Sequence, residues 1–319
     1  MLTDIINQIN KNPPTILVVG DLMLDRFIFG GVERISPEAP VPIVKLKKEK
    51  QMLGGSGNVI RNLSNLGIQT SLCSVVGNDS AGDFLIDQLA EKNIGISNVV
   101  RLNSIRTTEK MRIVADRQQI ARVDWDMDQF KADFVDDLIK NISGHIENID
   151  GVIISDYAKG MCSKVLLKKL IKISNNNNIP IFVDPKGHDW EKYEHTNLIT
   201  PNIKEAETVL GKKLRNDHDF ERAGKKICST YNIKACLITR GGEGMSFFCK
   251  DNTFHLKSKA KEIFDVSGAG DTVISTMASG LVMNLTYKQA AEFSNQAAGI
   301  VVGHIGTSAI TTRELLNLN

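Results

Sequence analysis

The chain has 319 residues, enough for one large α/β domain or two small ones, and its 42% hydrophobic and 24% charged residues indicate a globular protein rather than a disordered or fibrous one. A formal net charge of +2 excludes a strong general attraction to nucleic acid or anionic membranes. The N-terminal stretch lacks a secretory pattern and no apolar run reaches the roughly 18 residues that span a bilayer, which predicts a cytoplasmic protein.

The first predicted elements belong to two kinds of sheet. Residues 15–20 (TILVVG) form a short apolar run that ends at glycine, which is typical of a buried parallel strand. Residues 27–35 and 41–48 alternate polar and apolar positions around Ser-Pro-Glu-Ala-Pro, which predicts antiparallel strands with one wet face. Residues 107–114 and 118–125 predict a hairpin that could join the same small sheet.

Most of the remaining chain alternates between strand and helix patterns. Further strands are predicted at residues 70–76, 151–155, 179–184, 198–200, 235–239 and 245–249. Helices are predicted at residues 58–66, 81–92, 132–146, 163–175, 203–210, 217–231, 269–283 and 287–302. This alternation predicts a mostly parallel central sheet with helices on both faces. We expect a single domain over residues 1–319, with the small β-sheet inserted at about residues 27–48 and 107–125.

The cysteines and histidines indicate no metal or disulfide framework. The five cysteines are scattered without a CxxC pair, and the six histidines lack ligand spacing. An odd, scattered set of cysteines favours buried reduced thiols over disulfides or a zinc site.

Polar residues gather where the predicted strands end. In parallel α/β sheets, ligands bind at the carboxyl ends of the strands. The residues at these ends are Asp21, Asp25, Asp156, Asp184, Lys186, Asn202, Glu205, Thr239 and Gly241. One of them alone would more often be a helix cap or a loop residue, but together they predict a ligand site.

The stretch DVSGAGDT (residues 265–272) places a glycine-rich turn before a predicted helix. The backbone N–H groups of Gly268, Ala269 and Gly270 can converge on an anion, which the helix N-terminus also favours. Asp271 would repel a phosphate, so it is better suited to accept a proton from an attacking hydroxyl. A plain helix start is the alternative, and the turn lacks the GxxxxGK[ST] pattern of a Walker loop.

Four stretches resemble signatures of the ribokinase-like (PfkB) family of sugar kinases, and they occur in the family's order. They are GGSGNVIRNLSNLG (54–67), PNIKEAE (201–207), TRGGEG (239–244) and DVSGAGD (265–271). The stretches GDLMLDRF, RISPEAPVPIV, TTEKMRIVADRQQIARVDW, SDYAKG and DPKG resemble the heptose 7-phosphate kinase branch. The resemblance implies a ribokinase-like fold with a β-sheet lid. It also implies a stand-alone kinase, because 319 residues leave no room for the nucleotidyltransferase half of bifunctional relatives.

The resemblance implies an activity as well. ATP would phosphorylate D-glycero-D-manno-heptose 7-phosphate at O1 to give the 1,7-bisphosphate, in ADP-heptose and lipopolysaccharide core biosynthesis. A kinase for another sugar or sugar phosphate, such as ribose or a fructose phosphate, is the alternative. A sugar-binding regulatory module is disfavoured because Asp271, Asn202 and Glu205 are all present. Since lids of relatives often pack together, we expect a homodimer through the lid.

The resemblance also assigns roles on the nucleotide side. Asp271 would be the catalytic base, with Gly268, Ala269 and Gly270 as the anion hole. The residues implied to contact ATP are Asn202, Glu205, Thr239, Gly241, Gly244 and Asn295. Glu205 would hold Mg²⁺ through water, since Mg²⁺ keeps several waters when bound. A dependence on a monovalent cation is left open.

On the sugar side, the resemblance implies that hydroxyl groups are bound by Asp21, Asp25, Gly54, Gly55 and Asn58. The 7-phosphate needs cations that a free-sugar kinase lacks. The candidates are Arg106, Lys110, Arg112, Arg117, Arg122, Lys159 and Lys186, with Asp156 and Asp184 at neighbouring strand ends. Because side chains alternate faces along a strand, Lys110 and Arg112 share one face, and a solvated face is the alternative for each lid cation.

The sequence departs from the wider family at two places. Val266 stands where threonine is common, and the heptose kinase branch tolerates this change. The Gly-Gly loop reaches Asn58 one residue sooner than in ribokinase, which leaves the sugar-contact geometry open.

Overall fold

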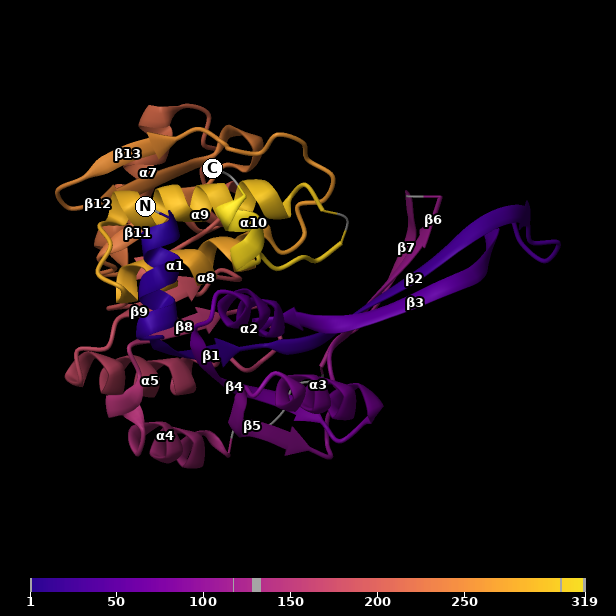
Figure 1. The fold of residues 1–319 in the computed structure, drawn as a ribbon, viewed down its shortest axis with the longest axis horizontal. Coiled ribbons are helices and arrows are strands. Elements are labelled where there is room, and N and C mark those ends of the chain that lie inside the picture. Colours follow the sequence, from indigo (N-terminus) through magenta and orange to yellow (C-terminus); the bar gives the residue numbers. More distant parts are fainter. Residues whose placement is uncertain (1, 117, 128–132, 305, 318–319) are drawn as a thin grey trace.

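The computed structural model describes residues 2–116, 118–127, 133–304 and 306–317. Within these ranges the strands form a nine-stranded sheet and a four-stranded sheet. Figure 1 shows the larger sheet inside a body of helices, with the smaller sheet projecting from it as a long arm. The predicted α/β architecture with a second small sheet is therefore confirmed.

The larger sheet has the order β13-β12-β11-β10-β9-β8-β1-β4-β5. Its strands are β1 (Thr15–Gly20), β4 (Gln69–Gly77), β5 (Gly95–Leu102), β8 (Gly151–Ser155), β9 (Ile181–Asp184), β10 (Leu198–Ile199), β11 (Ala235–Thr239), β12 (Met245–Cys249) and β13 (Thr253–Leu256). The seven strands β11, β10, β9, β8, β1, β4 and β5 pair in parallel with their neighbours. At the β11 end, β12 and β13 extend the sheet by antiparallel pairing. The carboxyl ends of the parallel strands therefore share one edge, where the functional residues lie.

Helices cover both faces of this sheet. One face packs against α1 (Leu2–Lys11), α2 (Ser56–Asn65), α3 (Ser80–Glu91), α8 (Ala269–Val282), α9 (Tyr287–Val301) and α10 (Thr312–Leu316). The other packs against α4 (Val135–Ser143), α5 (Lys164–Asn176), α6 (Ile203–Leu210) and α7 (Asp217–Thr230). Alternate residues of β1 feed the two cores, with Ile16 and Val18 on one face and Leu17 and Val19 on the other. None of the helices described combines the length and apolar character needed to cross a bilayer.

The smaller sheet, which we call the lid, has the order β3-β2-β6-β7. Its strands are β2 (Leu22–Ile35), β3 (Pro42–Gly55), β6 (Glu109–Ala115) and β7 (Gln118–Trp125). The predicted hairpin thus joins the sheet, through parallel pairing of β6 with β2. The first lid strands are longer than predicted because their inner ends, at Leu22 and Leu53, are buried in the body.

Four elements were not predicted from the sequence: α1, α10, β5 and β13. β5 (GISNVVRL) is an edge strand with several exposed polar positions, so it lacks the apolar run of an interior strand. The helix predicted at residues 132–146 is shorter, α4 covering Val135–Ser143, and residue 132 lies outside the described residues.

Candidate active site

Asp271 lies in the first turn of α8, and only 3% of it is exposed. The preceding Gly268 caps the helix with a φ of 83°, a conformation that favours glycine. A Cβ at Gly268 would also approach Asn58 Nδ2 to 2.7 Å. The Ala269 N–H is already bonded to the Val266 carbonyl, at an N···O distance of 3.2 Å. In the described residues, the N–H groups of Gly268, Gly270 and Asp271 have no acceptor, so they are the donors available to an anion.

Two side chains hold the Asp271 carboxylate. The Tyr157 hydroxyl donates to Oδ1 at 2.6 Å, and Asn58 Nδ2 donates to Oδ2 at 2.8 Å. Burial raises the pKa of Asp271 to about 6, although the hydrogen bonds from Tyr157 and Asn58 pull it down, as does Lys110. Asp25 raises this pKa further. Asp271 is therefore ionised near neutral pH yet basic enough to accept a proton.

Asn58 lies in α2 and is fully buried. Its Oδ1 accepts from Arg61 Nη1 at 3.1 Å, while its Nδ2 donates to Asp271. Both ends of the amide are thus occupied by protein groups, whereas the sequence predicted a direct sugar contact for Asn58. The geometry supports an indirect role, in which Asn58 orients the carboxylate.

Asp25, on β2, lies on the lid side of Asp271. Arg112 Nη1 is 2.6 Å from its Oδ1, and Thr307 Oγ1 donates to its Oδ2 at 3.2 Å. Gly54 gives this carboxylate room, because a Cβ there would lie 2.5 Å from Asp25 Oδ2. Gly55, with a φ of 58°, leads the chain from β3 into α2. Asp25, Gly54 and Arg112 thus come together as predicted from the sequence.

The lid cations divide between two places. Lys110 Nζ lies 5.1 Å from the centre of the Tyr157 ring, and its charge acts on the Asp271 carboxylate. Arg106 instead stacks on Trp125 at 4.7 Å and lines a separate cavity with Asp79 and Glu109, so it does not join the group around Asp271.

Two further predicted cations are paired with acids. Lys159 is 2.5 Å from Asp126, and Arg122 is 2.9 Å from Asp124. Arg117 lies outside the described residues.

Asp21 is held by three backbone donors. It accepts from the backbone N–H groups of Tyr157 (2.8 Å), Lys159 (3.1 Å) and Met161 (3.0 Å). These bonds fold the loop after β8, which favours a structural role for Asp21 over the sugar contact predicted from the sequence.

Asp156 is likewise occupied by protein donors. Ala158 N–H (2.7 Å), the Tyr193 hydroxyl (2.6 Å) and the Lys192 ammonium all bond to it. Cys162 lies near both carboxylates, and the protein donors already bonded to them favour a structural cluster over a metal site.

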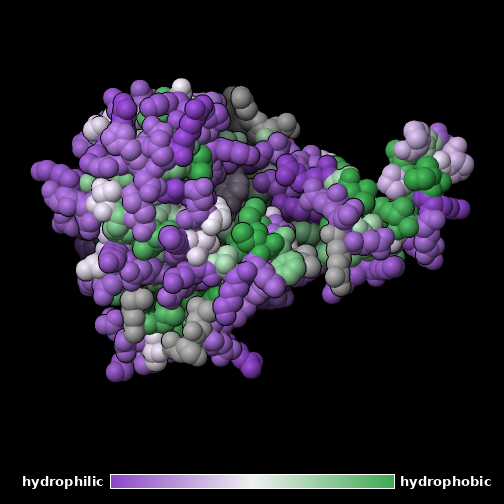
Figure 2. All heavy atoms as spheres, turned by 90° about the horizontal axis from the view of Figure 1, so that it is seen from above, coloured by the Kyte–Doolittle hydropathy of each residue, from purple (hydrophilic) through white to green (hydrophobic). Residues whose placement is uncertain are grey.

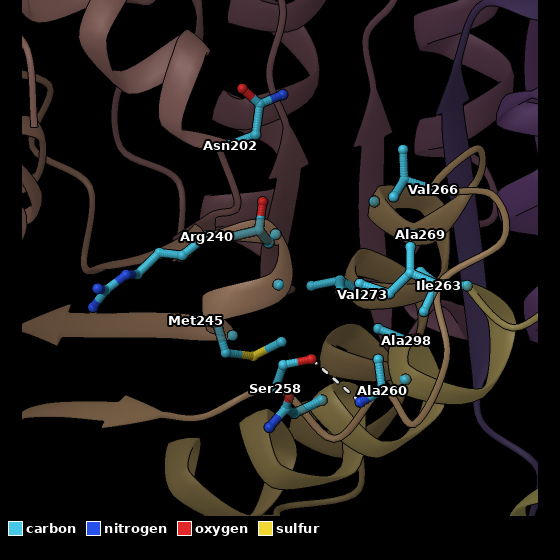
Figure 3. Close-up of a pocket in the computed structure, with 18 of the residues that line it drawn as sticks. Asn202, Arg240, Met245, Ser258, Ala260, Ile263, Val266, Ala269, Val273 and Ala298 are labelled. Carbon is cyan, nitrogen blue, oxygen red and sulfur yellow. Dashed lines mark hydrogen bonds between the residues drawn. The ribbon is translucent and has the colours of Figure 1, made fainter.

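The nucleotide-side residues line a cavity of about 490 Å³ between β11, β12, α8 and α9 (Figure 3). The predicted residues Asn202, Thr239, Gly241, Gly244 and Asn295 all line it. Figure 3 shows Val273 and Ala298 facing Met245 across this space, while the Arg240 side chain extends away from it.

One end of the cavity is formed by the glycine turn. Ala269 and Gly270 are among its lining residues. A ligand that fills the cavity therefore reaches the free N–H donors beside Asp271.

Two acidic residues flank the other side of Asp271. Glu205 closes a capping box with Asn202 (Asn202 N to Glu205 Oε2, 2.9 Å) and bonds Lys186 Nζ through Oε1 at 2.7 Å. Burial raises the pKa of Asp184 well above its usual range, and the charges of Glu205 and Asp271 add to this effect. Asp184 and Lys186, predicted to contact the substrate, therefore lie beside Glu205, and the charge of Asp184 also acts on Tyr157.

The donor set of Asp184 and Glu205 suits a divalent cation. In the described residues the Asp184 carboxylate accepts no hydrogen bond. Lys186 interacts with three acids, Glu205, Asp184 and Asp156, so negative charge exceeds positive charge in this cluster. A bound cation would reduce that excess.

The sequence reasoning missed Tyr157, Arg61 and Thr307. Tyr157 follows directly on Asp156 at the end of β8, so the strand-end rule that selected Asp156 could have selected it. Arg61 and Thr307 carried no comparable signal.

Comparisons with known proteins identify the family of the chain. Residues 14–313 match the pfkB family carbohydrate kinase profile. The chain is 41% identical over 303 residues to the bifunctional protein HldE of Actinobacillus succinogenes, covering 95% of this chain and 63% of that protein. It is 39% identical over 302 residues to HldE of Geobacter sulfurreducens, covering 94% and 62%. The chain thus spans less than two thirds of the length of these relatives.

Solved structures share the fold. Phosphofructokinase-2 from Escherichia coli, in complex with potassium, aligns with a TM-score of 0.81 and 19% identity, covering 96% of this chain and 97% of that one. Ribokinase from Arabidopsis thaliana, complexed with ribose and ATP, aligns with a TM-score of 0.75 and 17% identity, covering 96% and 98%. At these identities the likeness shows the fold alone.

The fold and the matched profile define a sugar kinase. The chain belongs to the pfkB family of carbohydrate kinases.

Proposed function

We propose that this kinase transfers the γ-phosphoryl group of ATP to O1 of D-glycero-D-manno-heptose 7-phosphate, giving the 1,7-bisphosphate. The observation that carries the proposal is the identity of about 40% to HldE proteins over nearly the whole chain. This likeness includes the stretches that resemble heptose 7-phosphate kinases. The cations beside the base suit a phosphorylated sugar, because Lys110 and Arg112 lie on the same lid face.

In the proposed reaction, Asp271 accepts the proton of the O1 hydroxyl while O1 attacks the γ-phosphorus. The bond between that phosphorus and the β–γ bridging oxygen breaks, and ADP leaves. The N–H groups of Gly270 and Asp271 stabilise the charge on the transferring group from fixed positions. The apolar walls at Val273 and Ala298 suit a purine base.

Asp184 and Glu205 would hold Mg²⁺, Glu205 through water because its oxygens already accept from Asn202 and Lys186. When bound, the ion neutralises negative charge on the phosphates.

Asp265 fixes the turn that precedes α8, because its oxygens accept from the N–H groups of Ser267 and Gly306. A potassium requirement stays a proposal to be tested by varying the salt.

A sugar panel tests the substrate. We expect kcat/KM for heptose 7-phosphate to exceed that for ribose, fructose 6-phosphate and unphosphorylated heptose by at least about 100-fold, since one phosphate subsite with paired cations contributes about 3 kcal/mol or more. ADP release is the assay, and phosphorus NMR locates the new phosphate. Faster turnover of a pentose or of fructose 6-phosphate would replace the heptose assignment by the alternative.

We also propose that two lids pair in a homodimer. Ile35, Val41 and Leu46 are 60%, 51% and 59% exposed at the far end of β2 and β3, and Figure 2 shows hydrophobic residues along the projecting arm. Light scattering after size exclusion should give about twice the 35.2 kDa chain mass, and Leu46→Glu should shift it toward monomer. A monomer at micromolar concentration in the unaltered protein would count against lid pairing.

A further inference from the structure

Tyr157 is half-buried, and of the two side chains that bond the Asp271 carboxylate it makes the shorter hydrogen bond. It follows β8 by two residues, and its hydroxyl donates to Asp271 Oδ1 at 2.6 Å. Burial, together with the charge of Asp271, raises the pKa of Tyr157 well above its usual range. The phenol therefore stays protonated and remains a hydrogen-bond donor throughout the pH range in which the enzyme would work.

The backbone beneath Tyr157 is fixed by buried acids. The Tyr157 N–H donates to Asp21 Oδ2 at 2.8 Å, and the next N–H, of Ala158, donates to Asp156 Oδ1 at 2.7 Å. Ala158 takes a φ of 56°, which turns the chain sharply at this point. These two carboxylates thus hold the tyrosine in place.

The other face of Tyr157 meets the lid. Lys110, on β6, places its ammonium 5.1 Å from the centre of the Tyr157 ring, within the range of a cation–π contact. The tyrosine therefore lies between the base on α8 and a cation carried by the lid. No other described aromatic ring contacts both the lid and Asp271.

The second carboxylate oxygen has an equally defined partner. Asn58 Nδ2 donates to Asp271 Oδ2, and Arg61 donates to Asn58 Oδ1, so the amide cannot turn over without losing both bonds. The carboxylate is thus held at both oxygens, and each oxygen keeps one lone pair for a substrate hydroxyl.

We propose that Tyr157 is a positioning residue of this kinase: its hydroxyl fixes the Asp271 carboxylate, and its ring seats Lys110 of the lid. The inference rests on the proposed role of Asp271 as the base. The titratable and charged groups that face Asp271 are Tyr157, Asp25, Lys110, Arg61 and Asp184.

The test is Tyr157→Phe, which removes the hydroxyl and keeps the ring. Because the hydroxyl stabilises the ionised carboxylate, its loss should raise the pKa of Asp271 and move the acidic limb of kcat/KM from about 6 upward by roughly one unit. At pH 6.5 a shift of this size should lower kcat about 3-fold, and well below pH 6 about 10-fold, with recovery as the pH rises to 9 and less than about 3-fold change in either KM. The substrate is heptose 7-phosphate, or whichever panel sugar is turned over faster.

Tyr231→Phe is the matched control, because its ring packs on Trp190 at 6.1 Å and touches none of these groups among the described residues. It should leave the profile unchanged. A Tyr157→Phe enzyme with an unmoved acidic limb, or with a raised sugar KM and unchanged kcat, overturns the inference. Asp271→Asn, measured in the same assay, separates the two claims. Native activity of this variant would mean that Asp271 is not the base. An inactive Asp271→Asn variant together with an unaltered Tyr157→Phe profile would overturn only the role of Tyr157.

Discussion

Asp271→Asn is expected to lower kcat by about 10²–10⁴-fold, the usual cost of removing a general base. The fold should tolerate the change, because the new amide oxygen can accept from Asn58 Nδ2 while its NH₂ group faces the Tyr157 hydroxyl oxygen. The KM for ATP should change little, since the nucleotide cavity is lined by other residues. ADP release under saturating substrates measures the loss.

The same base predicts a pH dependence. Because burial raises the pKa of Asp271 to about 6, kcat/KM should fall about tenfold per pH unit below that value as the carboxylate becomes protonated. Asp251→Asn, an exposed aspartate between β12 and β13, is the control and should keep native activity. Native kcat in the Asp271 variant would mean that another group takes the proton.

Lys192→Met should be the most damaging change to stability away from the base. The Lys192 ammonium pairs with Asp156 and also donates to the Cys162 carbonyl at 3.3 Å, while the Asp156 side chain is only 1% exposed. Burial and the charge of Asp156 already raise the pKa of Asp21. Removing the Lys192 ammonium would leave these two buried carboxylates without the cation that offsets the charge of Asp156.

Breaking a buried pair in this way costs about 3–5 kcal/mol, and we expect the lower end because Tyr193 and Ala158 still donate to Asp156. Urea unfolding at neutral pH gives the free energy difference. Lys172→Met, at an exposed position on α5, should change it by less than about 0.5 kcal/mol. A Lys192 variant as stable as that control would remove the structural role assigned to this cluster.

Much of the fold was predictable because its strands are short apolar runs. β1, β8, β11 and β12 occur at the predicted bounds, since each interior strand is buried on both faces and flanked by polar turns. β5 was missed because an edge strand needs fewer apolar positions. The sequence left open whether residues 107–125 join the same sheet as residues 27–48. The parallel pairing of β6 with β2 depends on contacts between segments far apart in the chain, which local patterns do not reveal.

The site was predictable as a set of residue types at strand ends, but not as a set of roles. Asp21, Asp25 and Asp156 look alike in sequence, and only the folded chain shows that backbone N–H groups occupy Asp21 and Asp156 while Asp25 faces Arg112. Tyr157 stands at a strand end like Asp156, but its contacts with Asp271 and Lys110 join segments far apart in the chain and are visible only in the folded structure.

The most direct test of the whole account is a crystal structure with heptose 7-phosphate and a non-hydrolysable ATP analogue. We predict the anomeric hydroxyl within about 3 Å of an Asp271 oxygen, the γ-phosphate against the N–H groups of Gly270 and Asp271, and the 7-phosphate on the Lys110 side of the lid. A sugar bound with its anomeric hydroxyl away from Asp271, or a γ-phosphate outside the glycine turn, would contradict the mechanism.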